Sequence, residues 1–147
     1  FGYFCTTWHY NVEGPGSKEF VDRFRKRWAS APIPVPDNVS SNGYIAMREM
    51  LRAIERAGTT RNHEVIKALE GHVIRDNFRK FPSTIRPWDH LVGQMITLAR
   101  TKREDQMKER WDMIEMIADI APEVAAPPQA ISKCRMQPLA ETPGYGG

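Results

Sequence analysis

The sequence predicts an α/β fold, with amphipathic helices in its first half and short strands in its second half. Between residues 17 and 71, apolar side chains recur every three or four positions, as they do on one face of a helix. After residue 83 they fall into short runs of β-favouring residues, which is typical of strands. An aromatic run at residues 1–8 adds a buried strand before the first helix.

The composition restricts the class of protein. A chain of 147 residues with 41% apolar side chains suits one ordinary domain or a piece of something larger. The net charge is only +3, with both signs interspersed, so no nucleic-acid partner is expected. No apolar run approaches the roughly 18 residues of a membrane span. Cys5 and Cys134 leave one disulfide and two free thiols equally open.

Residues 17–29 are predicted to form the first helix, which Ser17 would cap by accepting a bond from an unpaired N–H. Its apolar face has a four-residue spacing: Phe20, Phe24 and Trp28. Prolines then occupy alternate positions 32, 34 and 36, a pattern that forbids a helix. We interpret residues 31–39 as an extended connector between two packed bodies, with a plain surface loop as the alternative.

A second helix is expected from the serines at 40 and 41, which would cap it, to Gly58, which would end it in a left-handed conformation. Its predicted core face has helical spacing: Tyr44, Met47, Leu51 and Ile54. A third helix is expected at residues 62–70, followed by Gly71 as its stop. It would bury Val65, Ile66 and Leu69.

Three strands are predicted in the second half, at residues 83–85, 94–100 and 111–117. The last segment also fits a helix by its spacing, because Met107, Trp111, Ile114 and Ile117 would share one face. The proline- and glycine-rich residues 122–147 are expected to form an extended tail.

The sequence contains no recognisable catalytic set, metal-ligand spacing or cofactor motif, so we expect a non-enzyme without metal or cofactor. Asp89 and His90 are an adjacent acid–imidazole pair. They stand on a predicted turn after Pro87, where an Asp side chain usually accepts backbone N–H groups. We therefore predict a structural role for Asp89 and a packed or hydrogen-bonded ring for His90.

Four blocks of the sequence, in this order, carry a family resemblance. They are SKEFVDRF at 17–24, GYIAM at 43–47 continuing to IERAGTT at 54–60, VIKALEG at 65–71, and IRPWDH at 85–90 with Gln94. The chain resembles the C-terminal part of type I periplasmic binding proteins, from the ABC-transporter subfamily that captures branched-chain amino acids, amides or urea. The resemblance also favours a strand over a helix at residues 111–117.

The resemblance implies two α/β lobes joined by three crossings, with the ligand in the cleft between them. Residues 1–30 would be a strand and helix of the second lobe, 31–39 a hinge connector, and 40–88 helices on the first lobe. Residues 89–120 would return to the second lobe as strands, before the tail at 121–147. The family's N-terminal portion has no counterpart here, so both lobes would be incomplete. A missing N-terminal portion or another chain would complete them.

The function that the resemblance implies is solute binding for an ABC importer in the periplasm. The ligand would be a small amino acid or amide, and the partner a membrane permease. The alternative is a truncated, binding-protein-like structural subunit docked on the periplasmic side of a larger membrane complex. Tyr10, Asn42 and Tyr44 are the expected ligand contacts, by their position beside the two crossings. Ordinary packing for Tyr44 and helix capping for Asn42 are the alternative interpretations.

Overall fold

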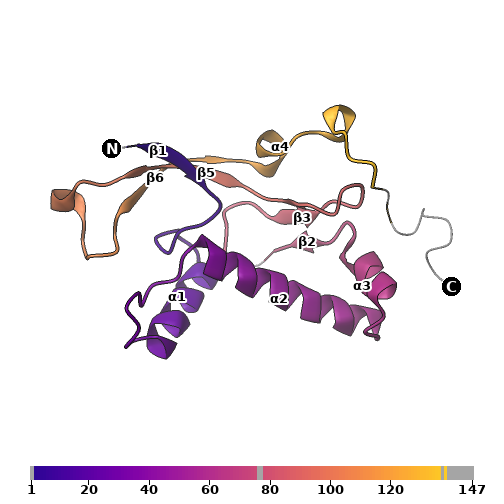
Figure 1. Cartoon of the computed structure of the whole chain (residues 1–147), viewed down its shortest axis with the longest axis horizontal. Coiled ribbons are helices and arrows are strands. Elements are labelled where there is room, and N and C mark those ends of the chain that lie inside the picture. The colour runs from indigo at the N-terminus through magenta and orange to yellow at the C-terminus, as the bar shows by residue number, and fades with distance from the viewer. Residues whose placement is uncertain (1, 76–77, 137, 139–147) are drawn as a thin grey trace.

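The computed structural model describes residues 2–75, 78–136 and 138, and it confirms the α/β class. Figure 1 shows one sheet at the top of the view, the helices α1 and α2 below it, and a second, smaller sheet between them. The elements run in the following order: β1 Tyr3–Thr6, α1 Pro15–Arg27, α2 Asn38–Ala57, α3 Asn62–Leu69, β2 Val73–Ile74, β3 Ser83–Ile85, β4 Val92–Gly93, β5 Ile96–Thr101, a 3-10 turn Glu104–Gln106, β6 Ile114–Ile120, α4 Pro122–Ala125 and a 3-10 turn Gln129–Ile131.

The larger sheet has the order β1-β5-β6, with both pairs antiparallel and β5 in the centre. Tyr3 lies opposite Arg100, so the first strand pairs with a segment almost a hundred residues later. A strand does form within residues 1–8, as expected, but the expectation that it is buried is wrong. Strand β1 is an edge strand and Tyr3 is 67% exposed, because no described element covers its outer face; only Trp8, beyond the strand, is fully buried.

Helix α1 begins two residues earlier than predicted, and Ser17 is not its cap. Gly14 occupies the cap position with a φ of 152°, a conformation that glycine adopts without strain, and Pro15 opens the first turn with its fixed φ. The Ser17 hydroxyl instead accepts a hydrogen bond from Trp8 Nε1 at 3.0 Å. Ser17 is therefore fully buried, where it ties the helix to the end of β1.

Helix α2 is also capped by a residue that the sequence interpretation passed over. Asp37 accepts hydrogen bonds from Ser40 N at 2.8 Å and from the Ser40 hydroxyl at 2.6 Å. Ser40 and Ser41 consequently lie inside the helix, since a carboxylate three residues earlier already satisfies the free N–H. The predicted end is confirmed, with Gly58 in the left-handed region at a φ of 64°.

Most of the predicted core face of α2 lies at the surface of the described chain, although Ile54 is half-buried. Tyr44, Met47 and Leu51 are 37%, 55% and 57% exposed. The buried positions are Ser41, Ile45, Glu49 and Ala53, on another face of the helix. The expectation was wrong for Met47 and Leu51, which the described residues leave mostly exposed, whereas Tyr44 packs in part against Phe20 and Phe78. Small and well-bonded polar side chains fill much of the inner contact. In α3, Val65 is buried as predicted, but Ile66 and Leu69 are only half-buried.

The core lies between the helices and the smaller sheet, which has the order β2-β3-β4. Its buried cluster consists of Trp8, Val21, Ile45, Ile74 and Phe78. Helices α1 and α2, on either side of the proline connector, both contribute to this cluster. Within the connector Val35 and Pro36 are buried, so it is not a plain surface loop. The assignment of these segments to lobes and hinges stays a prediction.

The strand predicted at 83–85 is confirmed with the same bounds as β3, and the other two predicted strands of the second half are confirmed in type but shifted in position. The expected strand at 94–100 is β5, Ile96–Thr101, and the ambiguous segment at 111–117 is the strand β6, Ile114–Ile120. Residues 121–136, expected to be extended, contain α4 and a 3-10 turn, because Pro122 can open a helix where no earlier N–H bond is required. The remainder of the predicted tail, residues 137 and 139–147, lies outside the described residues.

Candidate functional site

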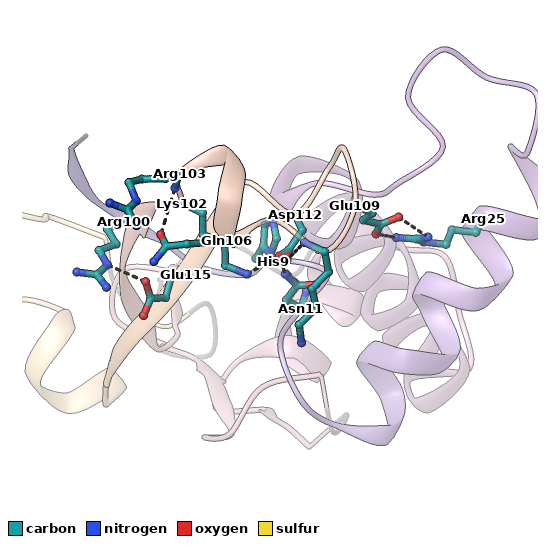
Figure 2. Close-up of polar contacts among 11 residues, drawn as sticks. His9, Asn11, Arg25, Arg100, Lys102, Arg103, Gln106, Glu109, Asp112 and Glu115 are labelled. Atoms are coloured by element: carbon teal, nitrogen blue, oxygen red, sulfur yellow. Dashed lines mark hydrogen bonds and ion pairs between the residues drawn. The ribbon is translucent and has the colours of Figure 1, made fainter.

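A polar cluster joins three segments that are far apart in the sequence. Figure 2 shows Asn11 from the β1–α1 connection, Arg25 from α1, and Lys102, Glu109 and Asp112 from the connection between β5 and β6. Asn11 Nδ2 donates to Asp112 Oδ1 at 2.6 Å across a separation of 101 residues. The cluster thus fixes the long β5–β6 connection against the beginning of the helical layer.

Asp112 is the centre of this cluster and its side chain is only 4% exposed. Besides Asn11, it accepts hydrogen bonds from Lys102 Nζ at 2.7 Å and from the backbone N–H of Lys108 at 3.0 Å. Burial opposes ionisation, but these three donors outweigh it and hold the pKa of Asp112 below its ordinary value. The carboxylate is therefore ionised and fully engaged.

His9 lies beside this cluster and is 8% exposed. Burial lowers the pKa of His9 to about 4, with Asp112 opposing the change and Lys102 adding to it. Its Nδ1 accepts a hydrogen bond from Asn11 N at 3.3 Å, which requires an unprotonated ring nitrogen. His9 is thus a neutral imidazole at pH 7.

Tyr10 packs against the same cluster. The Arg25 guanidinium lies 5.3 Å from the centre of the Tyr10 ring and forms a two-pronged ion pair with Glu109. Burial and the neighbouring Glu109 carboxylate raise the pKa of Tyr10. Tyr10, Asn11, Arg25 and Asp112 all line one cavity of about 660 Å³.

Asn42 and Tyr44 belong to other cavities. Asn42 lines a cavity of about 440 Å³ beneath α2, where its Nδ2 donates to Thr7 Oγ1 at 3.2 Å and its Oδ1 accepts from Arg79 Nη2 at 2.7 Å. Tyr44 lines a third cavity, of about 720 Å³, next to α1. The structure therefore does not bring the three expected contacts together, and their role in ligand binding stays a prediction.

Asp89 has the structural surroundings that the sequence predicts. Its Oδ1 accepts the backbone N–H of Leu91 at 3.1 Å, and both carboxylate oxygens accept from Arg86, with Arg86 Nε at 3.0 Å from Oδ1. His90 has a φ of 56° and its Nε2 lies 2.8 Å from Glu70 Oε1. The carboxylate is buried and bonded to the backbone, so the turn prediction is confirmed.

Comparison with known protein families shows which family the chain belongs to. A family model described as periplasmic binding protein matches residues 2–106, which is more than half of the chain. The chain belongs to the periplasmic binding protein family. The resemblance predicted from the four sequence blocks is thereby confirmed.

Solved structures of this family have the same fold. A periplasmic binding protein from Burkholderia mallei has a TM-score of 0.79 at 22% identity, and an amino acid ABC transporter substrate-binding protein from Pseudomonas fluorescens has 0.73 at 21%. A branched chain amino acid ABC transporter periplasmic ligand-binding protein from Burkholderia xenovorans has 0.79 at 26%. Each match covers 91% of this chain and 34% of the solved chain, so the chain spans about a third of their length. No curated protein matches the sequence.

These proportions support the predicted fold class, a partial two-lobe α/β fold. Among residues 2–75, 78–136 and 138, none of the helices is both long enough and apolar enough to span a bilayer.

Sequence reasoning missed the cluster around Asp112. Asn11, Lys102 and Asp112 carry no motif, and Lys102 and Asp112 lie in a mixed-charge stretch that resembles a solvated loop. The sequence offered one signal. Asp112 stands just before the apolar run that was predicted as a strand, so a charged side chain next to that strand could be seen, but not the residues that bond to it.

Proposed function

We propose that this chain forms part of the substrate-binding protein of an ABC importer that works in the periplasm. The ligand would be a branched-chain amino acid, an amide or urea, and the macromolecular partner a membrane permease. The observation that carries the proposal is the likeness to the Burkholderia xenovorans protein, whose description names a branched chain amino acid transporter. The family match over residues 2–106 supports the same function.

The proposed function is binding without chemistry. Asp112 and Glu49 are buried carboxylates, but cationic or amide donors engage each of them, so neither is poised to move a proton. Capture would proceed by closure of two lobes about their connecting segments. The parts of the lobes outside this chain would supply the rest of the cleft.

Tyr10, Asn42 and Tyr44 are the proposed ligand contacts. Tyr44 is the most exposed of the three, whereas the amide of Asn42 already bonds Thr7 and Arg79. A ligand would therefore reach Tyr44 most readily, on the part of its ring that Phe20, Phe78 and Arg48 leave exposed.

Calorimetric titration of the full-length protein with L-leucine, L-isoleucine, L-valine, acetamide and urea tests the proposal. Saturable binding of one of them is expected. Tyr10→Ala or Tyr44→Ala should weaken that binding by more than about 1 kcal/mol, as for loss of a buried aromatic contact. Unchanged affinity in both variants would remove these residues from the site, and no binding of any of these solutes would remove the function.

The exposed stripe on α2 favours a second candidate, a truncated structural subunit whose stripe packs on another polypeptide. Met47 and Leu51, more than half exposed, are costly to leave in water. The mass of the polypeptide purified from its source separates the two functions. A mass about 2.7 times 16.9 kDa, the ratio of the 91% and 34% coverages, supports the importer component, and 16.9 kDa supports the subunit.

A further inference from the structure

The end of helix α1 carries positive charges without acidic neighbours in the sequence. Residues 23–36 contain no Asp or Glu, and they contain four cations: Arg23, Arg25, Lys26 and Arg27. Arg25 is already paired with Glu109. The other three side chains are exposed. These three give one end of a helix a local positive charge as large as the net charge of the whole chain, +3.

These three cations are available to a partner outside the described residues. Arg23 lies 3.5 Å from the Glu19 carboxylate, but both side chains are at least 70% exposed, so this pair is weak. Neither Lys26 nor Arg27 forms an ion pair within residues 2–75, 78–136 and 138. Arg27 instead lies over the Trp28 ring, 5.5 Å from its centre. The charges therefore remain open to an anionic surface.

Exposed apolar side chains lie beside these cations. Trp28 caps the end of α1 and is 50% exposed, and Ile33 follows it on the proline connector at 58%. A hydrogen bond from Ala31 N to Trp28 O, at 3.0 Å, turns the chain directly after the helix. Figure 1 shows the end of α1 and this connector at the lower left of the view, below the larger sheet. Residues 23–33, which we call the α1 tip, thus combine positive charge with a tryptophan at one edge of the described chain.

The α1 tip differs from the exposed stripe on α2 around Met47 and Leu51. That stripe is apolar, so a further layer of protein could cover it. A layer over Lys26 and Arg27 would remove unpaired charges from water, which is costly unless new partners neutralise them. We therefore expect the tip to stay at the surface of a larger protein that contains this chain.

We propose that the α1 tip binds the surface of a bilayer that contains anionic lipids. Arg23, Lys26 and Arg27 would contact the lipid phosphates, since basic side chains are attracted to an anionic headgroup layer. Trp28 would lie among the headgroups, because its ring is apolar and its N–H is polar. The inference goes beyond the proposed function, because this contact involves neither the solute nor the permease.

A lipid surface fits the tip better than an acidic protein does. A folded partner requires a complementary shape, with side chains packed closely at the centre of the interface. A fluid headgroup layer requires only charge and an apolar anchor, which Lys26, Arg27 and Trp28 supply. A helix with a basic polar face and a tryptophan is also typical of peripheral membrane contacts. The attraction should weaken as the salt concentration increases, because ions screen exposed charges.

Sedimentation of the full-length protein with lipid vesicles tests the proposal. At low salt the protein should bind vesicles of phosphatidylcholine and phosphatidylglycerol at least about tenfold more tightly than vesicles of phosphatidylcholine alone. The variant Arg23→Gln/Lys26→Gln/Arg27→Gln should lose at least about tenfold in affinity for the anionic vesicles. Trp28→Ala should also weaken this binding, and Trp28→Phe should weaken it less.

The matched control is Arg61→Gln/Arg75→Gln/Lys133→Gln, which removes the same charge from exposed positions outside the tip. Its affinity for the anionic vesicles should stay close to that of wild type. Equal losses in the two triple variants would overturn the inference, because net charge and not the tip would then govern binding. Equal affinity of wild type for both kinds of vesicle would overturn it too, and so would binding to neither, in which case the tip fits an acidic protein instead. Solute titration tests the importer function separately, so each can fail while the other holds.

Discussion

The buried His9 predicts that the protein loses stability as the pH falls through the mildly acidic range. In the unfolded chain His9 takes up a proton near pH 6.5, whereas burial keeps it neutral in the folded chain down to about pH 4. Between these values the unfolded state binds more protons than the folded state, so the free energy of unfolding decreases with falling pH. Above pH 6.5 His9 makes no difference, and below pH 4 its effect is complete.

The magnitude follows from the pKa difference. Each pKa unit corresponds to about 1.4 kcal/mol, so the full effect is about 3 kcal/mol, of which about 2 kcal/mol is lost by pH 5. The measurement is restricted to pH 7.5–5.0, because most carboxylates stay ionised in this range and contribute little to the change in stability. Urea unfolding of the full-length protein, followed by tryptophan fluorescence, reports the free energy at each pH.

The variant His9→Gln isolates this contribution, because glutamine is polar and does not titrate. The variant should lose about 2 kcal/mol less than wild type between pH 7.5 and pH 5.0. His63→Gln removes a histidine from α3 and controls for the number of histidines. An equal loss in His9→Gln and wild type would refute the reasoning.

Further predictions concern Asp112, Asp89 and the isolated chain. Asp112→Ala should destabilise the full-length protein by about 3 kcal/mol, because it leaves the half-buried Lys102 ammonium and the Asn11 amide without their buried acceptor; a cost below about 1 kcal/mol in urea unfolding would contradict this. Asp89→Ala should cost about 1 kcal/mol more than Asp89→Asn, since asparagine still accepts the Leu91 N–H; equal thermal shifts would disprove it. The isolated 147-residue chain should aggregate or bind hydrophobic dyes, and Leu51→Glu should improve its solubility; a sharp, reversible melt of the wild-type monomer would show a self-contained fold.

Local sequence signals predicted the three long helices and the strands β3, β5 and β6, but not the short elements β2, β4 and α4 or how the helices begin. The spacing of Phe20 and Phe24 placed α1, and Gly58 placed the end of α2, because both signals act within a few residues. The caps were wrong at both helices. Serine, aspartate and glycine all suit the position before a helix, and the choice depends on what else the side chain can bond. Ser17 bonds Trp8 Nε1, a partner that depends on how β1 leads into α1.

The candidate site was less predictable than the fold for the same physical reason. Asp89 could be assigned because Leu91 and Arg86 lie within three residues of it. Asp112 could not, because one of its donors, Asn11, lies 101 residues away and comes close only when β1 pairs with β5. Tyr10 and Tyr44 were chosen by position beside expected crossings, and position alone does not say which cavity a ring enters.

The apolar spacing of α2 predicted that one face of the helix is buried, whereas the structure buries another face. Its inner face buries Ile45 and Ala53, together with Glu49, whose carboxylate is satisfied by Arg48, Arg52 and His72. Its outer stripe of Tyr44, Met47 and Leu51 is more regular and more apolar, yet it is exposed. A helix with apolar residues on two sides packs between two layers rather than at the edge of one. The chain supplies one of these layers and about a third of the length of its solved relatives. We infer that the outer stripe packs against a second layer that the described residues do not supply, either more of the same polypeptide or another chain.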